Sequence, residues 1–401
     1  MKALIVLENH FYKDNDGIVW CDRIIDYNFL KRYLSVFENI VVAGRCEKIE
    51  ENIGDKLLVS GKNVEFIELP EFIGAKGLIK NIYKIRKILR KAIRDTNCTI
   101  YRAPTHISLF TYKEVLKEHK PLALEFMMAA DKMIDGKNII KILINKLIKL
   151  KAKKMCLKAN GVSYVTERIL QKDYPCKAII DGESNDFFTS SYSTIDLEEE
   201  DFYKRNWKID EKPEVFKIIH TGYMDSYRKG QDVLIKAVKE VKEAGYNVEL
   251  ILIGDGKKKE EFEKLACKLQ IEDIVKFKGL IKDKKEIIDN LRKAHILVFP
   301  TQSEGLPRTI IEAMAQGLPC ISSPVDGIPE LLDDEFLIDY TNYKAYADKI
   351  IELITNWEKM KKISLQNYEK SQKYKKEVLM NKRKEFYKKL KRMAEYGTKE
   401  K

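Results

Sequence analysis

Two acidic side chains, Glu304 and Glu312, lie close together in a segment that mixes turn-forming and helix-forming residues. Carboxylates placed in this way support two kinds of chemistry. As a general acid and a base they could hydrolyse a glycosidic bond. As hydrogen-bond acceptors they could instead hold the hydroxyls of a sugar or a ribose. The elements that carry the two glutamates decide between these alternatives.

A strand, a loop and a helix are predicted to position this pair. The apolar run Ile296 to Phe299 predicts a buried strand, which Pro300 ends. Pro307 suits the first position of a helix, and the pattern after it predicts a helix from about Arg308 to Gln316. A second short strand is expected at Leu318 to Ser322. This order of elements is typical of a crossover in a parallel α/β sheet.

Ligands of such sheets bind beyond the carboxyl ends of the strands, where the loop from Ser303 to Pro307 is expected. The free N–H groups of Thr309 and Ile310, at the start of the predicted helix, would favour phosphate. Glu304 and Glu312 would then lie on the two sides of the bound anion. A diphosphate with a polyol at each end fits this arrangement, so the segment favours a nucleotide sugar over a glycoside.

The stretch from His295 to Leu331 closely resembles the E-x7-E signature of glycosyltransferase family 4, which are retaining enzymes of the GT-B fold with nucleotide-sugar donors. Three fragments carry the resemblance, namely Glu304-Gly305-Leu306-Pro307, Glu312-Ala313 and Gly317-Leu318-Pro319. It implies that Glu304 contacts hydroxyls of the donor sugar and that Glu312 contacts the ribose. It also implies that nearby residues hold the sugar and the diphosphate, and these are Gly305, Leu306, Arg308, Thr309 and Ile310.

The segment after Val215 provides a second set of candidate donor contacts. By position, Lys229 matches the lysine with which this family binds the diphosphate, so it joins Glu304 as a candidate catalytic residue. A positive charge there would stabilise the leaving diphosphate. The family usually has an arginine where this chain has Tyr223, and Arg228 is a candidate replacement. The remaining implied donor contacts are Gly222, Gly254, Gly279, Leu280 and Ile281.

The first half of the chain predicts another parallel sheet, because short β-rich runs alternate with helical patterns. These runs are Ile40 to Ala43, Val64 to Leu69, Thr99 to Arg102, Leu122 to Phe126 and Val162 to Val165. The fragments Arg32 to Arg45 and Val162 to Pro175 resemble the amino-terminal domains of bacterial exopolysaccharide and capsule transferases of the same family. Many members have a cleft-facing histidine after the strand that matches Leu122 to Phe126. This chain lacks it, so Glu125 and His106 are the candidate substitutes.

A first strand is expected at Lys2 to Leu7, followed by a long polar loop and then by a helix from about Arg23 to Phe37. Gly17 in this loop is a candidate for close approach of the backbone to a phosphate or sugar, and a plain turn is the alternative. Asp14-Asn15-Asp16 has the D-x-D pattern of metal-dependent sugar transfer, but it suits a turn better. The resemblance implies no metal and no cofactor beyond the UDP- or GDP-linked donor substrate.

The formal net charge of +12 favours anionic partners. Two basic amphipathic segments, Lys76 to Arg94 and Asn138 to Met155, suit an anionic membrane surface, and the alternative is an outer helix with its lysines in water. We expect no nucleic acid partner, because DNA binding would leave the E-x7-E loop unexplained. Polar residues soon after Met1 argue against a signal peptide, so a cytoplasmic location is expected, with peripheral contact at the inner face of the cell membrane. The seven scattered cysteines predict neither disulfides nor a zinc site.

Taken together, these observations predict an α/β protein of the GT-B class, with two Rossmann-like parallel-sheet domains facing each other across a cleft. The predicted domains are an acceptor domain at residues 1–185, a linker at 186–214 and a donor domain at 215–373, with the helix at about 374–401 packing back on the acceptor domain. The predicted activity is metal-independent, hexosyltransferase-like transfer to a glycan or lipid-linked acceptor in surface polysaccharide biosynthesis. The alternatives are a nucleotide-sugar-binding subunit without turnover and a nucleotide-sugar epimerase. A dinucleotide site at Gly254 and Gly256 is disfavoured, because no third glycine follows.

Overall fold

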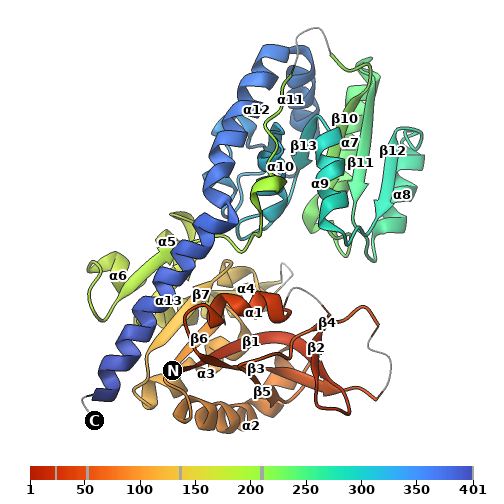
Figure 1. Ribbon diagram of the computed structural model, residues 1–401. Helices are drawn as coiled ribbons and strands as arrows, with labels where there is room; N and C mark the ends of the chain where they lie inside the picture. Colours follow the sequence, from red (N-terminus) through yellow and green to blue (C-terminus); the bar gives the residue numbers. More distant parts are fainter. Residues whose placement is uncertain (23–24, 51–53, 135–137, 208–211, 400–401) are drawn as a thin grey trace. The chain divides into compact units, whose positions relative to one another are not determined.

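The computed structural model describes residues 1–22, 25–50, 54–134, 138–207 and 212–399. The chain divides into two compact units, one formed by Met1–Tyr192 with Met380–Lys401 and the other by Ser193–Leu379. Figure 1 colours the first unit from red to yellow-green, with the darkest blue end of the chain, and the second unit from green to blue. Each unit is built on a sheet with parallel strands, so the prediction of two Rossmann-like α/β domains is confirmed.

Within the described residues, the sheet of the first unit has nine strands. Its parallel strands lie in the order β5-β3-β1-β6-β7-β8-β9, while β2 pairs antiparallel with β1, and β4 pairs antiparallel with β2. Both faces of the central strands are covered, which explains their nearly continuous apolar sequences. The strands are β1 (Lys2–Lys13), β2 (Val19–Cys21), β3 (Asn39–Lys48), β4 (Leu57–Leu58), β5 (Val64–Leu69), β6 (Cys98–Ala103), β7 (Leu122–Phe126), β8 (Gly161–Tyr164) and β9 (Phe188–Ser191).

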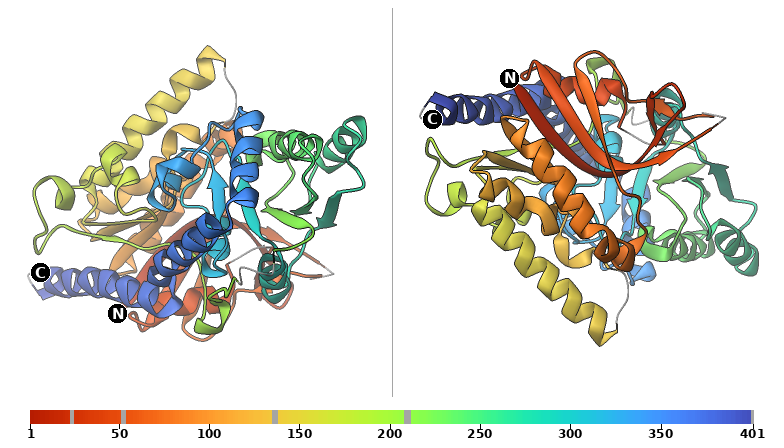
Figure 2. Two further views of the ribbon diagram at one scale, coloured as in Figure 1. Left: turned by 90° about the horizontal axis from the view of Figure 1, so that it is seen from above. Right: turned by 90° about the horizontal axis from the view of Figure 1, so that it is seen from below.

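Helices cover both faces of this sheet (Figure 2). The helices α2, α3 and α4 pack side by side, whereas α1 contacts α13 through the rings of Tyr33 and Tyr387, whose centroids are 5.2 Å apart. The helices of this unit are α1 (Tyr27–Leu34), α2 (Gly74–Arg94), α3 (His106–Lys117), α4 (Ile139–Lys158), α5 (Ile169–Asp173) and α6 (Lys177–Ile180), and α13 (Lys376–Lys399) joins it from Met380 onward.

A buried carboxylate ties α1, β7 and α13 together. Glu125 on β7 accepts hydrogen bonds from the hydroxyl of Tyr33 on α1, at 2.8 Å, and from the hydroxyl of Tyr387 on α13. The guanidinium of Arg102 lies 3.8 Å from the same carboxylate. Since all of these groups are largely or fully buried, each one needs the others to satisfy its hydrogen bonds.

The region after the first strand differs from the sequence-based expectation. Instead of ending at Leu7, β1 continues to Lys13 and forms a hairpin with β2. The Asp14 carboxylate accepts hydrogen bonds from the N–H groups of Asp16 and Ile18 and from the indole of Trp20, so the D-x-D pattern is part of the hairpin turn. The predicted helix from Arg23 is shorter, because α1 begins at Tyr27, and residues 23–24 lie outside the described part of the chain.

The sheet of the second unit has five parallel strands in the order β12-β11-β10-β13-β14. The helices α8 and α11 pack on α7, and α9 and α12 pack on α10, as expected for right-handed crossovers that leave both faces of a sheet covered. The elements are β10 (Phe216–Thr221), α7 (Gln231–Glu243), β11 (Val248–Ile253), α8 (Lys259–Lys268), β12 (Val275–Gly279), α9 (Lys284–Lys293), β13 (Ile296–Phe299), α10 (Arg308–Ala315), β14 (Cys320–Ser322), α11 (Tyr343–Thr355) and α12 (Trp357–Ser371).

The stretch expected as a linker, residues 186–214, is distributed between the two units in the described part of the chain. Phe188–Ser191 forms β9 at the edge of the first sheet. The guanidinium of Arg205 donates to the carbonyl oxygens of Gln316 at 2.7 Å and Ala294 at 2.8 Å, which anchors this segment on the second unit. The composition predicted a separate acidic linker here. The described residues of this stretch instead pack on the two units, because residues such as Phe188 and Arg205, which lie between the acidic ones, make the contacts.

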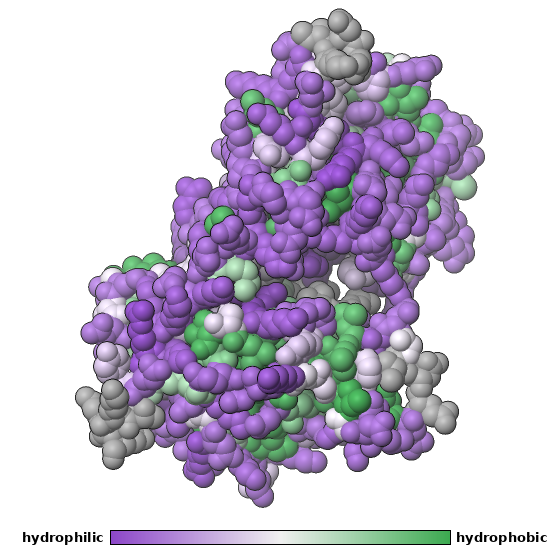
Figure 3. Space-filling view, in the orientation of Figure 1, coloured by the Kyte–Doolittle hydropathy of each residue, from purple (hydrophilic) through white to green (hydrophobic). Residues whose placement is uncertain are grey.

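Several large apolar side chains of the first unit are exposed to solvent, most of all on α4. On α4 these include Ile139, Ile140, Ile142, Leu143 and Leu147, each at least half exposed. Figure 3 shows green, apolar patches on the part of the first unit that faces the viewer, while the drawn surface of the second unit is mostly hydrophilic. Within the described residues, however, the helices are too short or too polar to cross a membrane.

The buried hydrogen bond between Tyr387 and Glu125 predicts a stability effect that a surface tyrosine does not have. We expect Tyr387→Phe to lower the free energy of unfolding of the first unit by about 1–3 kcal/mol, because a hydrogen bond to a buried charged group is lost. Urea unfolding, with hydrogen exchange of amides in β7 as a local probe, measures the change. Tyr396→Phe, at an exposed position on the same helix, is the control. Equal losses in the two variants would contradict the role of Glu125.

Candidate functional site

The candidate donor residues of the second unit meet at one edge of its sheet. The strand order changes direction between β10 and β13, and at such a switch point the loops beyond the carboxyl ends diverge and leave room for a ligand. Gly222 follows β10, and the loop from Thr301 to Glu304 follows β13. Two segments that are far apart in the sequence therefore border the same point.

Glycines allow the neighbouring loops at this edge to approach each other closely. A Cβ atom on Gly254 would lie 2.0 Å from the carbonyl oxygen of Gly222, which no side chain permits. The Gly254 N–H donates to the carbonyl oxygen of Gly279 at 2.8 Å. Gly222, Gly254 and Gly279 therefore lie together at the carboxyl ends of β10, β11 and β12, where Gly254 is buried and the other two are partly exposed to a ligand.

The two candidate catalytic residues are in direct contact. The ammonium of Lys229 forms an ion pair with the carboxylate of Glu304, and it lies over the ring of Phe299, 5.5 Å from the centroid. Both side chains keep some exposure, 25% for Lys229 and 14% for Glu304. The pair is thus accessible to a ligand, and a phosphate would compete with Glu304 for the lysine.

The start of α10 is joined to the end of β10. The hydroxyl of Thr221 donates to the hydroxyl of Thr309 at 3.0 Å, and Thr309 in turn lies 3.3 Å from the carbonyl oxygen of Thr221. Pro307 precedes the helix without a side-chain cap, so the first N–H groups of α10 have no capping carboxylate or hydroxyl at that position. The positive end of this helix is therefore free to favour an anion beside Gly222.

Glu312 lies further along α10 in a more enclosed environment than Glu304. Burial raises the pKa of its carboxyl, while the nearby charges of Arg308 and Lys284 act in the opposite direction. Within the described part of the chain, its carboxylate receives no hydrogen bond. A partly buried carboxylate of this kind gains from hydroxyl donors supplied by a ligand.

The other candidate donor contacts in the E-x7-E stretch differ in how far their side chains are buried. The side chains of Leu306 and Ile310 are buried in the core, so only their backbone can contact a ligand. Arg308 is exposed at the start of α10, and Gly305 accepts a hydrogen bond from the Gly327 N–H at 2.9 Å. The candidates outside this stretch are more exposed: Tyr223 and Leu280 are nearly half exposed, and Arg228 and Ile281 are partly buried.

His220 supports Lys229, although no motif in the sequence marks it as a site residue. Its ring is fully buried beside the Phe299 ring, with Nε2 2.9 Å from the carbonyl oxygen of Lys229. Burial lowers the pKa of this imidazole to about 4, so the ring is neutral near pH 7 and its Nε2–H donates to that carbonyl. His220 thereby fixes the backbone from which the Lys229 side chain extends.

Asp326 is a second residue that the sequence reading missed. Its carboxylate accepts hydrogen bonds from the Glu304 N–H at 2.7 Å and from the Ser303 hydroxyl at 3.1 Å. The residue has a left-handed backbone with φ of 48°, which aspartate tolerates better than most side chains. The Asp326-Gly327 dipeptide after a predicted strand was the available signal, since it marks a turn at the same sheet edge.

In the first unit, the two candidates for the missing histidine have different surroundings. The Glu125 carboxylate is enclosed by Tyr33, Tyr387 and Arg102, so it is a structural group and not a replacement for a cleft side chain. His106 is 25% exposed, and its Nδ1 lies 2.9 Å from the Glu8 carboxylate. Gly17 lies in the turn of the β1–β2 hairpin, with φ of 80°, and its predicted contact with a ligand stays a prediction.

Residues 199–370 match the family model described as glycosyl transferases group 1. This range contains the ion pair of Lys229 with Glu304, the start of α10 and the glycine turns described above. The chain is a glycosyltransferase. Protein CapJ of Staphylococcus aureus is 26% identical over 329 residues, which are 81% of this chain and 79% of CapJ. The amylovoran biosynthesis glycosyltransferase AmsK of Erwinia amylovora is 36% identical over 112 residues, 26% of this glycosyltransferase and 27% of AmsK.

The fold of this glycosyltransferase is also found among solved structures. HepE of Anabaena, in a crystal structure with UDP-glucose, superposes with a TM-score of 0.62 at 14% sequence identity, and the alignment covers 100% of both chains. With such structural neighbours and two units of the Rossmann type, the glycosyltransferase has the GT-B fold. The predicted fold class is therefore confirmed.

The buried His220 predicts how the second unit responds to acid. Its pKa is about 4 in the folded protein, below the ordinary 6.5, so the unfolded chain binds the proton first and stability is lost as the pH falls through this window. Between pH 7 and pH 4 the loss from this ring amounts to about 3 kcal/mol.

We expect His220→Gln to flatten the pH dependence of the unfolding free energy of the second unit by about that amount, as measured by urea unfolding at several pH values. His119→Asn, at an exposed position in the first unit, is the control. An unchanged slope in His220→Gln would mean that the ring is already charged in the folded state.

Proposed function

We propose that this glycosyltransferase moves a sugar from a UDP- or GDP-linked donor to a glycan or lipid-linked acceptor in surface polysaccharide biosynthesis, with retention of the anomeric configuration and without a metal. One observation carries the donor assignment. At the switch point of the second sheet, Lys229 and Glu304 are paired beside the uncapped start of α10, where a diphosphate and a sugar can be bound at the same time.

In the proposed mechanism, the diphosphate of the donor lies at the first turn of α10 and draws Lys229 away from Glu304. Negative charge increases on this diphosphate as the bond to the sugar breaks, and the lysine and the helix N–H groups stabilise it. Glu304, released from the ion pair, accepts hydrogen bonds from the sugar hydroxyls. Glu312 accepts hydrogen bonds from the ribose, which its enclosed position and lack of a protein donor favour.

Separate observations support the product, the donor, the stereochemistry and the absence of a metal. The AmsK name refers to amylovoran biosynthesis, and the HepE structure contains UDP-glucose, which favour a polysaccharide product and a UDP-linked donor. Retention of configuration and metal independence rest on the resemblance of the E-x7-E stretch to family 4. The cation at Lys229 also supplies, from the protein itself, the charge that a metal would otherwise provide.

The experiment that tests this proposal compares donors and then variants. Thermal shifts with UDP-, GDP- and ADP-sugars select the donor, and release of the nucleotide diphosphate is then followed in the presence of EDTA. We expect Lys229→Ala and Glu304→Ala to lower the rate by about 10²–10³-fold, the loss typical of a removed transition-state contact. Lys257→Ala, at an exposed position in the same unit, should leave the rate unchanged. Full activity of either site variant would contradict the assignment. The coupling constant of the anomeric proton in the NMR spectrum of the product, compared with that of the donor, would decide retention.

We also propose that the first unit contacts an anionic membrane at its cytoplasmic face through α2 and α4. Both helices combine exposed apolar side chains with many lysines, and Ile139, Ile140 and Tyr83 are among the most exposed large apolar residues. Such a surface gains apolar insertion together with about 1 kcal/mol per basic residue near anionic lipid.

Sedimentation with vesicles tests the membrane contact. We expect binding to phosphatidylglycerol vesicles that weakens with salt, and little binding to phosphatidylcholine. The double change Ile140→Ser with Leu143→Ser should weaken binding by at least about tenfold, since two apolar side chains no longer insert. Leu365→Ser, at an exposed apolar position of the second unit, is the control. Equal binding to neutral and anionic vesicles would contradict the proposal.

A further inference from the structure

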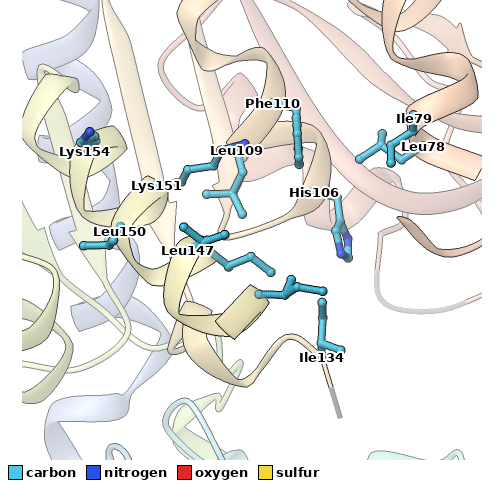
Figure 4. Close-up of a pocket in the computed structure, with 12 residues that line it drawn as sticks. Leu78, Ile79, His106, Leu109, Phe110, Ile134, Leu147, Leu150, Lys151 and Lys154 are labelled. Carbon is cyan, nitrogen blue, oxygen red and sulfur yellow. The ribbon is translucent and has the colours of Figure 1, made fainter. Parts of the chain in front are cut away.

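The first unit contains an apolar pocket whose role the transfer of a sugar does not by itself explain. It has a volume of about 380 Å³, which lies within the range of roughly 300–1,000 Å³ typical of ligand sites. Its walls come from three helices on one face of the sheet, with Leu78 and Ile79 on α2, Leu109 and Phe110 on α3, and Leu147 on α4 (Figure 4). A pocket with such walls accepts hydrocarbon.

The polar groups of the pocket lie at opposite sides, and the described residues that line it include no acid. Figure 4 draws His106 at one side and Lys154 at the other, with Lys151 between Leu150 and Leu109. Lys151 lies over the Phe110 ring, 3.7 Å from its centroid, and burial lowers the pKa of its ammonium, with repulsion from Lys113 and Arg86 adding to the effect. Glu114, the acidic residue on α3 nearest to these charges, is already paired with Arg90. A ligand with negative charge would relieve this accumulation of cations.

One end of the pocket leads to the edge of the sheet where ligands of this fold bind. The order of the strands in the sheet reverses between β1 and β6, and His106 follows β6 while Glu8 lies on β1. The two side chains are in contact, with Nδ1 and Oε1 2.9 Å apart, and the Ile107 N–H donates to the other oxygen of Glu8 at 2.8 Å. Burial opposes the charge on Glu8, but these hydrogen bonds hold its pKa below the ordinary value. The pocket therefore connects the apolar helix α4 with a polar, charged group at the switch point.

From these three features we propose that the pocket between α2, α3 and α4 binds the hydrocarbon chain of a phosphate-bearing lipid acceptor, and that it directs the polar end of this lipid toward His106 and Glu8. The inference rests on the proposed transfer function and narrows its acceptor from glycans in general to lipid-linked ones. The exposed apolar residues at the start of α4, whose amino-terminal end projects past the sheet of its unit in Figure 2, provide a route for the chain from a membrane surface.

Binding of dodecyl phosphate, measured by calorimetry below its micelle concentration, tests the pocket directly. We expect one molecule to bind per chain, with affinity that falls by about tenfold for each pair of methylene groups removed from the probe. Inorganic phosphate should not compete, and dodecyltrimethylammonium, with the same chain and the opposite charge, should bind more weakly. Equal affinity for the two amphiphiles, or no dependence on chain length, would overturn the proposal.

Two variants of α4 separate the pocket from a general apolar surface. Leu147→Trp fills the pocket, whereas Leu143→Trp makes the same change at a position of similar exposure, 55% against 61%, that does not line it. We expect Leu147→Trp to weaken dodecyl phosphate binding by at least about tenfold, and Leu143→Trp to keep it within twofold. Both variants should still bind anionic vesicles. Equal losses of dodecyl phosphate binding in the two variants would mean that α4 binds lipid through its whole apolar surface, and would overturn the proposed acceptor pocket.

Nucleotide-sugar binding, measured on the same samples, tests the donor site separately from the lipid pocket. Leu147→Trp should retain its thermal shift with the preferred nucleotide sugar, and Lys229→Ala should lose that shift while it still binds dodecyl phosphate. Wild-type protein that binds and turns over the donor but does not bind dodecyl phosphate would refute the lipid pocket alone. Protein that binds dodecyl phosphate but no nucleotide sugar would refute the donor assignment alone.

Discussion

The close approach of backbone segments beyond the strands of the second sheet is the constraint on which the donor site depends. Gly222, Gly254 and Gly279 come within hydrogen-bonding or van der Waals distance of one another, and a side chain at Gly254 would collide with the Gly222 carbonyl. On the other side of β10, its end lies beside the start of α10, where Thr221 and Thr309 exchange hydrogen bonds. The charged groups can then act on one ligand, because the backbone beneath them is fixed.

Supporting polar groups then hold the charged residues in place. His220 fixes the main chain of Lys229, and Asp326 fixes the main chain of Glu304, so each member of the ion pair is positioned through its backbone. The side chains themselves remain partly exposed and can exchange partners. The backbone of Lys229 and Glu304 is thus held in place, while their charged side chains can move over a short range. A site that binds and releases a charged substrate requires this combination.

Much of the fold could be predicted from the sequence, because its signals are local. Pro300 and Pro307 delimit β13 and α10 within a residue or two, and the apolar runs mark the central strands of both sheets. The β1–β2 hairpin was missed, since the second half of β1 is polar and its partner strand is very short. His220 and Asp326 could not be assigned, because each acts on a backbone group that is brought near only by the tertiary fold. The structural role of Glu125, which the sequence left open, could not be assigned for the same reason, as its tyrosine partners come from α1 and α13.

The last long helix has a further consequence for how the molecule tolerates change at its end. α13 starts in the second unit, where Lys376 pairs with Glu198, and its later turns complete the core of the first unit through Phe386, Tyr387 and Leu390. Removing those turns would therefore remove part of the hydrophobic core of the first unit. The other segment of this unit ends almost two hundred residues earlier, at Tyr192. Folding of the first unit is therefore finished only after the residues that follow Met380 have been synthesised.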